Sequence, residues 1–181
     1  MSFVVRPATS ADAAALAAVA AITFPLACPP QTTDEAKASF IADVLSEERF
    51  REYTSDGERL VLIAEESAGE RPPETIGYTM LVFGEPHDPD VIAALSIRPT
   101  AELSKCYVLP GHHGAGVAAM LMTASLEAAR ARGAAGVWLG VNEENAKAQR
   151  FYGKHGFARV GMKHFVLGDR LEDDHVFERA L

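Results

Sequence analysis

The sequence has few of the residues that disulfide frameworks, basic binding faces and membrane spans require. Its two cysteines, Cys28 and Cys106, are too few for a disulfide scaffold and lack the spacing of metal ligands. Basic residues are outnumbered, since 17 lysines and arginines stand against 25 aspartates and glutamates and give a formal net charge of -8. Nucleic acids and anionic membranes call for basic patches, so we expect neither as a partner. An acidic chain would suit a cationic small molecule instead.

Long apolar runs are also missing, and we expect no segment that crosses a bilayer. The most apolar stretch, residues 13–27, resembles the core of a secretory signal. Asp12 precedes it directly, however, and Arg6 is the only basic residue before it. Helical spacing favours a core helix ended by the prolines from Pro25 onward, and we expect a cytoplasmic protein. The expected buried stripe of this helix is Leu16, Val19, Ala20 and Thr23.

The first half of the chain predicts helices followed by a pair of antiparallel strands. Thr32 and Glu35 offer a capping box at the start of the second helix. Residues 85–100 are rich in proline and predict a loop with one short element near residues 91–97. The expected elements are a strand over 2–7, helices over 9–24, from 32 and through 50–53, and strands over 59–66 and 75–84.

The second half predicts a strand, a helix and a second strand parallel to the first, which is the pattern of a crossover. The expected elements are a strand over 101–109, a helix over 115–132, a strand over 136–142, a helix over 144–154, and strands over 157–167 and 173–181. The apolar stripe expected on the first of these helices is Val117, Met120, Leu121, Ala124 and Ala128. Together the elements predict an α/β fold, a mixed sheet with helices on both faces.

The junction between the strand over 101–109 and its helix lacks the usual capping residue. Gly114, Ala115 and Gly116 stand where Ser, Thr, Asp or Asn would hydrogen-bond the first N–H groups of the helix. The amides from His113 to Ala118 should therefore be free, with the partial positive charge of the helix end behind them. Backbone of this kind cradles a pyrophosphate. The alternative is a tight turn that needs glycine only for its dihedral angles.

Three features resemble the GCN5-related N-acetyltransferase (GNAT) superfamily. Residues 113–118, HGAGVA, match its phosphate motif Gln/Arg-x-x-Gly-x-Gly/Ala except at the first position. Residues 142–157, NEENAKAQRFYGKHGF, look like its second signature, and Glu102 lies where many members keep a catalytic Glu. The likeness covers the whole chain and is closest to PaiA-like bacterial polyamine acetyltransferases, through ITF, WLGV and residues 164–181. It implies one domain over residues 1–181, with a mostly antiparallel sheet and a splayed parallel strand pair.

The resemblance implies that acetyl-CoA is the cosubstrate and binds where the two parallel strands part. Its pantetheine arm would pair with free main-chain groups of Val108 and Leu109, and its diphosphate would rest on the loop amides. Lys147, Arg150 or Lys154 would meet the ribose 3′-phosphate. The residues implied as cofactor-binding are Tyr107, Val108, Leu109, His113, Gly114, Ala115, Gly116, Val117, Ala118, Asn142, Asn145, Ala148 and Lys154.

Two further residues would carry the catalysis that the resemblance implies. Glu102 would take a proton from the incoming ammonium, and Tyr152 would protonate the departing CoA thiolate. The primary amine then attacks acetyl-CoA directly, without a covalent enzyme intermediate, and a polyamine such as spermidine is the implied acceptor. A structural role remains open for each residue: Glu102 could pair with Arg98 or Lys105, and Tyr152 could be a half-buried aromatic.

The chain departs from the family motif at His113, where Gln or Arg is usual, and Ala115 stands where basic residues are frequent. The loop would therefore depend on main-chain donors, and His113 could carry charge beside a phosphate. The six histidines show no ligand spacing, so we expect no metal. An acidic acceptor mouth would attract a polycation. Candidates for it are Glu35, Glu47, Glu48, Glu85, Asp88 and Asp90.

Two other functions fit parts of the pattern. Residues 114–119, GAGVAA, satisfy the fingerprint of a dinucleotide-binding oxidoreductase, but the ribose-binding acid expected about twenty residues further on is missing. A CoA-binding sensor without catalysis is the other alternative, although it would not need both Glu102 and Tyr152. Edge strands of such folds often pair, so a homodimer is a further hypothesis.

Overall fold

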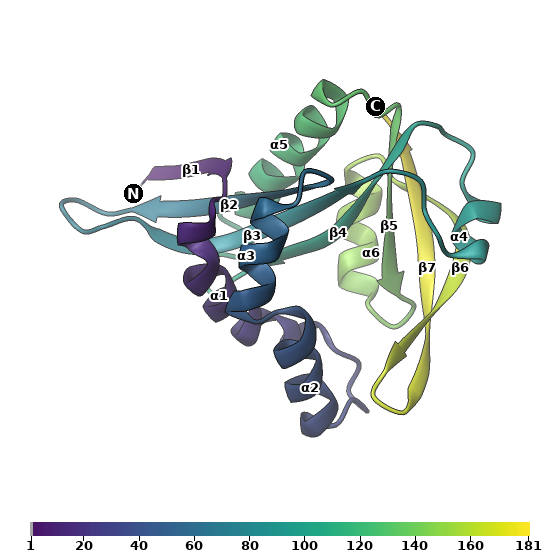
Figure 1. Ribbon diagram of the computed structural model, residues 1–181, viewed down its shortest axis with the longest axis horizontal. Coiled ribbons are helices and arrows are strands. Elements are labelled where there is room, and N and C mark those ends of the chain that lie inside the picture. The colour runs from purple at the N-terminus through teal and green to yellow at the C-terminus, as the bar shows by residue number, and fades with distance from the viewer. Residues whose placement is uncertain (1) are drawn as a thin grey trace.

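The computed structural model describes residues 2–181 and contains a seven-stranded sheet in the order β1-β2-β3-β4-β5-β7-β6 (Figure 1). Its strands are β1 (Ser2–Pro7), β2 (Arg59–Ser67), β3 (Glu74–Phe83), β4 (Thr100–Val108), β5 (Gly136–Asn142), β6 (Ala158–Leu167) and β7 (Arg170–Ala180). Its helices are the 3-10 turn η1 (Ser10–Asp12), α1 (Ala13–Ala27), α2 (Asp34–Val44), α3 (Glu47–Ser55), α4 (Pro89–Ala94), α5 (Val117–Ala131) and α6 (Ala146–Lys154). The predicted mixed α/β class is confirmed.

The sheet divides between β4 and β5. Neighbouring strands of the described chain pair antiparallel except these two, whose parallel ladder joins only residues 100–102 to residues 136–138. Beyond Glu102, β4 stays paired with β3 and β5 stays paired with β7, so the two strands diverge (Figure 1). The splayed parallel pair expected from the sequence is therefore present.

Helices cover both faces of the sheet, and β2 shows why. Alternate side chains of a strand point to opposite faces. Val61 and Ile63 pack in the cluster that includes α1, whereas Leu62 and Ala64 pack in the cluster that includes α5. Burial on both faces explains why residues 60–64 are continuously apolar rather than alternating.

η1 and α1 together form a helix, Ser10–Ala27, of 18 residues and mean hydropathy 1.6. By length and composition alone this helix could cross a membrane, which corrects the expectation from the sequence. The buried core helix of a globular protein meets the same criteria, and the predicted stripe is buried here. Its members Leu16, Val19 and Ala20 pack in a cluster with side chains of β2 and β3.

The expected end of α1 is wrong, because Pro25 lies inside the helix. A proline removes one backbone hydrogen bond from a helix and usually ends it. Here the last turn continues to Ala27, and Phe24 holds it in place by stacking on Phe40, with 4.4 Å between ring centroids. Tertiary packing thus offsets the local preference.

Two other helix boundaries also differ from the sequence expectation. The cap of α2 is Thr33 rather than Thr32, since the Thr33 hydroxyl accepts the Ala36 N–H at 3.1 Å. Residues 85–100 contain α4 rather than an unassigned element. The Asp88 side chain caps this short helix, and a proline occupies its first position, as helix N-termini favour.

The buried face of α5 differs from the predicted apolar stripe. Met120 is 37% exposed, while the polar Ser125 is buried. The Ser125 hydroxyl lies 2.8 Å from Thr79 Oγ1 and donates to the Leu121 carbonyl at 2.7 Å, so its burial leaves no polar atom unpaired. Apolar periodicity misses such a residue. The buried side chains of α5 are Val117, Leu121, Met122, Ser125, Leu126 and Ala129.

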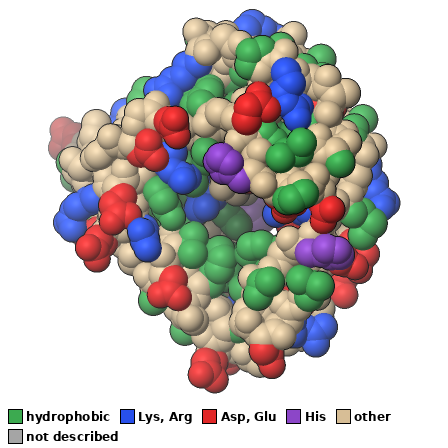
Figure 2. Space-filling model, turned by 45° about the vertical axis from the view of Figure 1, so that its right-hand side comes forward, with side chains coloured by type: hydrophobic (Ala, Val, Ile, Leu, Met, Phe, Trp, Pro, Cys, Tyr) green, Lys and Arg blue, Asp and Glu red, His purple; other side chains and the backbone are tan. Residues whose placement is uncertain are grey.

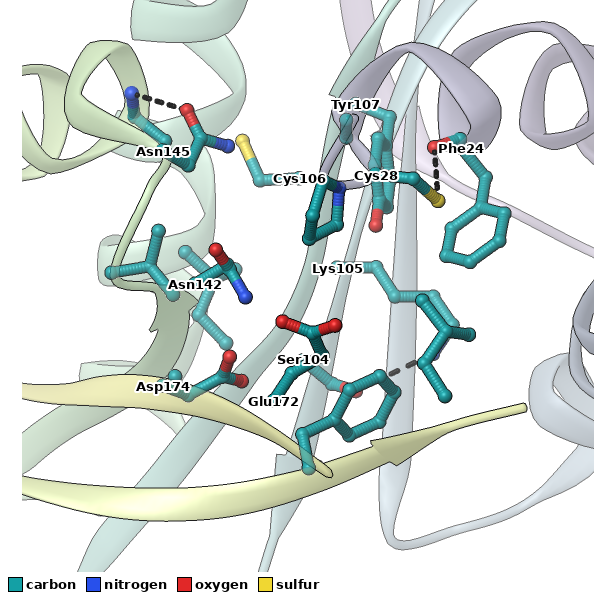
Figure 3. Close-up of a pocket in the computed structure, with 18 of the residues that line it drawn as sticks. Phe24, Cys28, Ser104, Lys105, Cys106, Tyr107, Asn142, Asn145, Glu172 and Asp174 are labelled. Atoms are coloured by element: carbon teal, nitrogen blue, oxygen red, sulfur yellow. Dashed lines mark hydrogen bonds between the residues drawn. The ribbon is translucent and has the colours of Figure 1, made fainter. Parts of the chain in front are cut away.

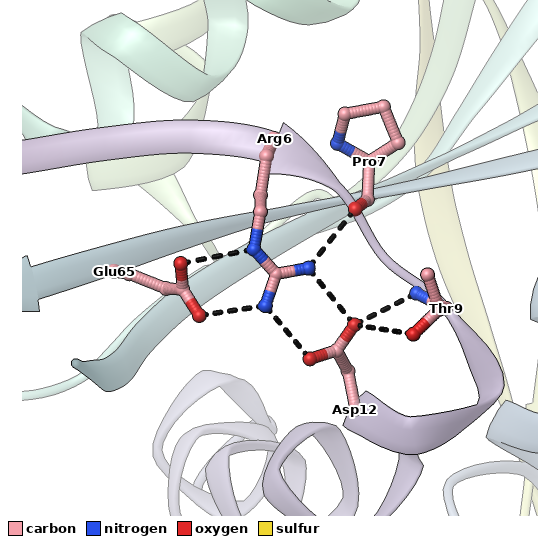
Figure 4. A network of polar contacts seen from close by, with 5 residues as sticks. All are labelled: Arg6, Pro7, Thr9, Asp12 and Glu65. Atoms are coloured by element: carbon pink, nitrogen blue, oxygen red, sulfur yellow. Dashed lines mark hydrogen bonds and ion pairs between the residues drawn. The ribbon is translucent and has the colours of Figure 1, made fainter. Parts of the chain in front are cut away.

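One arginine ties the N-terminal strand to its neighbours (Figure 4). The Arg6 guanidinium donates to both carboxylate oxygens of Glu65, at 3.0 and 2.7 Å, and to both of Asp12, at 3.0 and 2.8 Å. Asp12 also accepts the Thr9 N–H at 2.7 Å. The hydrogen bond from Arg6 is the main reason that the pKa of Asp12 falls to about 2. The network therefore joins β1, β2 and η1.

We expect Asp12→Asn to lower the free energy of unfolding at pH 7 by about 1 kcal/mol, since solvent partly screens this ion pair. The folded-state pKa of Asp12 is depressed from 3.8 to about 2, so its contribution is complete above the unfolded value. It is lost as pH falls through about 2, and the variant and the wild type should then converge. Denaturant unfolding across this pH range measures the difference. Glu70→Gln, in an exposed loop, is the control, and a constant difference at every pH would contradict the prediction.

Candidate active site

Two adjoining cavities lie where β4 and β5 diverge. The first has a volume of about 300 Å³ and the second about 480 Å³. We call the first the β7 cavity, since its wall includes Glu102, Lys105, Lys163, Glu172 and Asp174. We call the second the loop cavity, since its wall includes His112, His113, Gly114, Gly116 and Ala118. Figure 2 shows a face of the molecule hollowed at its centre, with hydrophobic side chains around the opening.

The two cavities share part of their walls, so a group at the shared wall is reached from both sides. Figure 3 shows the β7 cavity, with β4 and α1 on one side and the start of α6 on the other. The shared residues are Ala27, Cys106, Tyr107, Asn145, Ala148 and Tyr152. Burial raises the pKa of the Cys106 thiol to about 12, so it stays protonated, as befits the small hydrophobe predicted there.

α5 begins without a side-chain cap, as the sequence predicts. Gly116 precedes it with φ of +82°, a left-handed conformation that glycine adopts at little cost. Ala115 is not free, because its N–H donates to the His112 carbonyl at 3.3 Å. The loop amides with no protein acceptor within residues 2–181 are those of His113, Gly114, Gly116, Val117 and Ala118. Most of the predicted donors are therefore available.

The end of β4 offers less free backbone than predicted. The Leu109 N–H donates to the Ile76 carbonyl at 2.8 Å and so faces β3. Successive residues of a strand direct their backbone groups to opposite sides, so those of Val108 face the gap. The Val108 carbonyl accepts a hydrogen bond from His113 Nε2 at 3.0 Å. The His113 side chain therefore points back to the end of β4. The presence of His in place of Gln or Arg did not predict this contact.

Glu102 lies at the apex of the gap, as the last β4 residue paired with both β3 and β5. Its carboxylate lines the β7 cavity. Burial raises the pKa of Glu102, while the charges of Lys163 and Lys105 lower it. Glu102 forms neither of the ion pairs considered from the sequence. Arg98 pairs with Glu85 at 2.7 Å, and in the described chain Lys105 forms no ion pair. A carboxylate whose pKa is raised, and which forms no hydrogen bond within the described chain, can exchange a proton with a ligand.

Tyr152 and Asn145 both reach the shared wall from α6, as their spacing of seven residues predicts. Asn145 caps this helix through its Oδ1, which accepts the Ala148 N–H at 3.1 Å, and its amide group lies beside Cys106 in Figure 3. Burial raises the pKa of Tyr152 well above its ordinary value, so its hydroxyl keeps its proton near neutral pH. The ring packs edge-on against Phe157.

Most of the chain, residues 29–157, matches the model of the Acetyltransferase (GNAT) family. An uncharacterized N-acetyltransferase of Mycobacterium tuberculosis (strain ATCC 25618 / H37Rv) is 46% identical over 170 residues, which are 94% of this chain and 98% of that protein. The chain belongs to the GNAT acetyltransferase family. It is an N-acetyltransferase that depends on acetyl-CoA, so neither alternative function drawn from the sequence is kept.

Two other proteins are similar to this GNAT enzyme, one in its fold and one in part of its sequence. The crystal structure of a PaiA N-acetyltransferase from Thermoplasma acidophilum, in complex with coenzyme A, has a TM-score of 0.76 and 21% identity and covers 100% of both chains. Streptothricin acetyltransferase of Streptomyces lavendulae is 44% identical over 75 residues, which are 41% of this chain and 40% of that protein. The PaiA likeness expected from the sequence is thus found at the level of the fold.

Most of the residues predicted to bind the cosubstrate line a cavity of this GNAT enzyme, but several do not. Leu109 faces β3, Val117 packs its side chain in the core, and Ala115 lies outside both walls. Lys154 ends α6, about 10 Å along the helix from Lys147, which lines the loop cavity instead. Asn142 lines the β7 cavity. The acidic residues proposed for the acceptor mouth line neither cavity.

Apart from Glu102, the sequence missed the charged residues of the β7 cavity. Glu172 and Asp174 alternate on β7, and Lys163 comes from β6. Lys105 follows a β-bulge, where the register against β3 shifts and leaves Ser104 as an extra residue. Because of the bulge, Glu102 and Lys105 line one cavity although they are three residues apart. The available signal for this site was a second charged residue, Lys105, in a strand that already holds Glu102.

Proposed function

We propose that this enzyme transfers the acetyl group from acetyl-CoA directly to a primary amine, with Glu102 as general base and Tyr152 as general acid. The observation that carries the proposal is the meeting of the two cavities at a wall that includes Tyr152, with Glu102 on the β7 side. An amine in the β7 cavity and a thioester in the loop cavity would meet at this wall. Acetyl-CoA supplies the activated acetyl group.

The loop cavity has the donors that a diphosphate needs. Free amides of the loop, from His113 to Ala118 with Ala115 excepted, would hold its oxygens at the N-terminus of α5. Lys147 is better placed than Lys154 for the ribose 3′-phosphate, because it lines this cavity. The shared-wall residues Tyr107, Asn145 and Ala148 would contact the pantetheine arm, and Asn142 would lie on the amine side.

The raised pKa values of Glu102 and Tyr152, which burial causes, support the two proton transfers. Glu102 would accept a proton from the acceptor ammonium, directly or through a water molecule, and its raised pKa brings it nearer the operating pH. The Val108 N–H faces the gap and would donate to the carbonyl oxygen of the acetyl group as negative charge develops there. Tyr152, protonated because of burial, would donate its hydroxyl proton to the departing sulfur.

A polyamine is the acceptor that the sequence suggests. Three carboxylates on the wall of the β7 cavity, those of Glu102, Glu172 and Asp174, outnumber the two lysines there and support a cationic acceptor. The test is thiol release from acetyl-CoA with spermidine and with n-butylamine, beside calorimetry with coenzyme A. If these carboxylates select a polycation, kcat/KM should be at least about tenfold higher for spermidine. Equal values would reject the polyamine, and binding of coenzyme A without turnover of any amine would reject the transfer itself.

Three wider expectations also remain proposals. A single sheet joins the loop cavity to the β7 cavity, which supports one catalytic domain over residues 1–181. A cytoplasmic location would suit an enzyme that uses acetyl-CoA as its cosubstrate. A homodimer stays a prediction, and the edge strand β6, with Val160 and Met162 exposed, offers a surface for it.

A further inference from the structure

Lys105 is a half-buried cation of the β7 cavity without an acidic partner. Its side chain lines the cavity, and in the described chain it forms no ion pair. Its hydrogen bond is to Ser104 Oγ at 3.4 Å. The Tyr53 ring centroid lies 5.7 Å from its Nζ, but Arg59 lies over the same ring at 5.0 Å. An ammonium with three donors is thus left with one long hydrogen bond on the wall of the cavity.

The charges on the opposite side of the cavity are better compensated. Asp174 lies 4.0 Å from Lys163, and Glu172 lies 3.1 Å from Arg170. Among the described charged residues on this wall, only Glu102 and Lys105 form no ion pair. Figure 3 places Lys105 on the side of Phe24 and Asp174 on the opposite side. The cavity therefore presents an unpaired carboxylate and an unpaired ammonium.

The surroundings of Lys105 disfavour its charge. Burial is the main cause that lowers the pKa of Lys105 to about 8; Arg59 adds to the decrease, while Glu102 opposes it. An anion beside Nζ would remove much of this penalty, because an opposite charge stabilises a buried ammonium. No carboxylate of the described chain takes that place, so a ligand is the natural source of one.

We propose that Lys105 binds an anionic group of the acceptor, and that the acceptor is a small primary amine that also carries a carboxylate. Its amine would lie towards Glu102 and its carboxylate towards Lys105 Nζ and Ser104 Oγ. The inference rests on the proposed acetyl transfer, but it names a different acceptor from the polyamine suggested by the sequence, and the acetylation assays decide between the two. Spermidine would bring a second ammonium towards Lys105, where like charges repel. A cavity of about 300 Å³ is at the small end of ligand sites and suits such a molecule.

The test compares matched acceptors on the wild-type enzyme and on Lys105 variants. Glycine, β-alanine, 4-aminobutyrate and 5-aminopentanoate vary the spacing between amine and carboxylate, and the primary amide of each is its neutral partner. We expect the best carboxylate to exceed its amide in kcat/KM by about 10–100-fold, the value of one charge-assisted hydrogen bond. Lys105→Met should reduce this ratio to about one, and Lys105→Arg should restore part of it.

Lys163→Met is the matched control, because Lys163 lines the same cavity but already pairs with Asp174. It should change the carboxylate and the amide in similar proportion. Calorimetry with coenzyme A shows whether each variant is folded, and Lys105→Gln replaces Lys105→Met if that variant is not. A wild-type preference for amides or spermidine, or a ratio that survives Lys105→Met, would overturn the inference while acetyl transfer stands.

Absence of turnover with every amine would reject the proposed transfer rather than the anion site. The site is then tested by titrating the enzyme–coenzyme A complex with each carboxylate and its amide. Tighter binding of the carboxylate, lost in Lys105→Met, would support the site. Equal affinities for the two would overturn it.

Discussion

Glu102→Gln should lower kcat/KM for the amine by about 10²–10⁴-fold, the range typical of a lost general base. The amide cannot accept the proton of the acceptor ammonium. The raised pKa of Glu102 also sets the sign of the pH dependence, since wild-type activity should fall as pH drops through a value above 4.5. The variant should lack this acidic limb. Initial rates of thiol release across pH measure both effects.

A stability measurement distinguishes the loss of activity in Glu102→Gln from misfolding. Because the folded-state pKa of Glu102 is raised, its ionised form opposes folding above that pKa, and the cost disappears when the group is protonated. The variant should therefore be at least as stable as the wild type at pH 7 by thermal unfolding. Glu172→Gln is the matched control in the same cavity, and it should keep the acidic limb. A Glu102→Gln enzyme with unchanged kcat/KM would show that Glu102 is only a carboxylate of the wall.

Tyr152→Phe should lower kcat by about 10²-fold or more and leave KM for acetyl-CoA nearly unchanged. The substitution removes the proton donor to the departing sulfur but keeps the ring that packs against Phe157. Since the hydroxyl has no hydrogen-bond partner in the described chain, its loss leaves no protein group unsatisfied. Steady-state kinetics with saturating amine separate the two constants.

Tyr78→Phe is the control for the loss of a buried hydroxyl. The Tyr78 hydroxyl is also without a partner, but it lies in the core cluster with α1 and lines neither cavity. This variant should keep wild-type activity and at least wild-type stability, because a buried unpaired hydroxyl is costly. If Tyr152→Phe proved as active as Tyr78→Phe, Tyr152 would be a packing residue, the alternative that its sequence position left open.

Local patterns in the sequence were enough to predict the elements around the loop cavity. The uncapped helix start at Gly116 requires only the absence of Ser, Thr, Asp or Asn nearby. Asn145 and Tyr152 follow from helical periodicity, which is a property of neighbouring residues. The end of α1 was misplaced because the packing of Phe24 on Phe40 joins residues distant in sequence. The start of α2 was misplaced by one residue because two adjacent threonines can both serve as its cap.

Apart from Glu102, the charged residues of the β7 cavity could not be predicted in the same way. Lys105 faces the cavity because of a bulge that appears only when β4 pairs with β3. Glu172 and Asp174 reach it because β7, far along the chain, pairs with β5. A periodic reading of β4 places Glu102 and Lys105 on opposite faces, and nothing in the local sequence indicates the extra residue.

The sequence by itself determined the mixed α/β class, the free amides before α5 and the placement of Tyr152 on a helix, because each depends on spacing within one element. The tertiary structure alone decided which charges share the acceptor cavity and which of them lack a partner. Those facts depend on strand register and on contacts between distant segments, and they set the burial that shifts the pKa values of Glu102 and Lys105 in opposite directions.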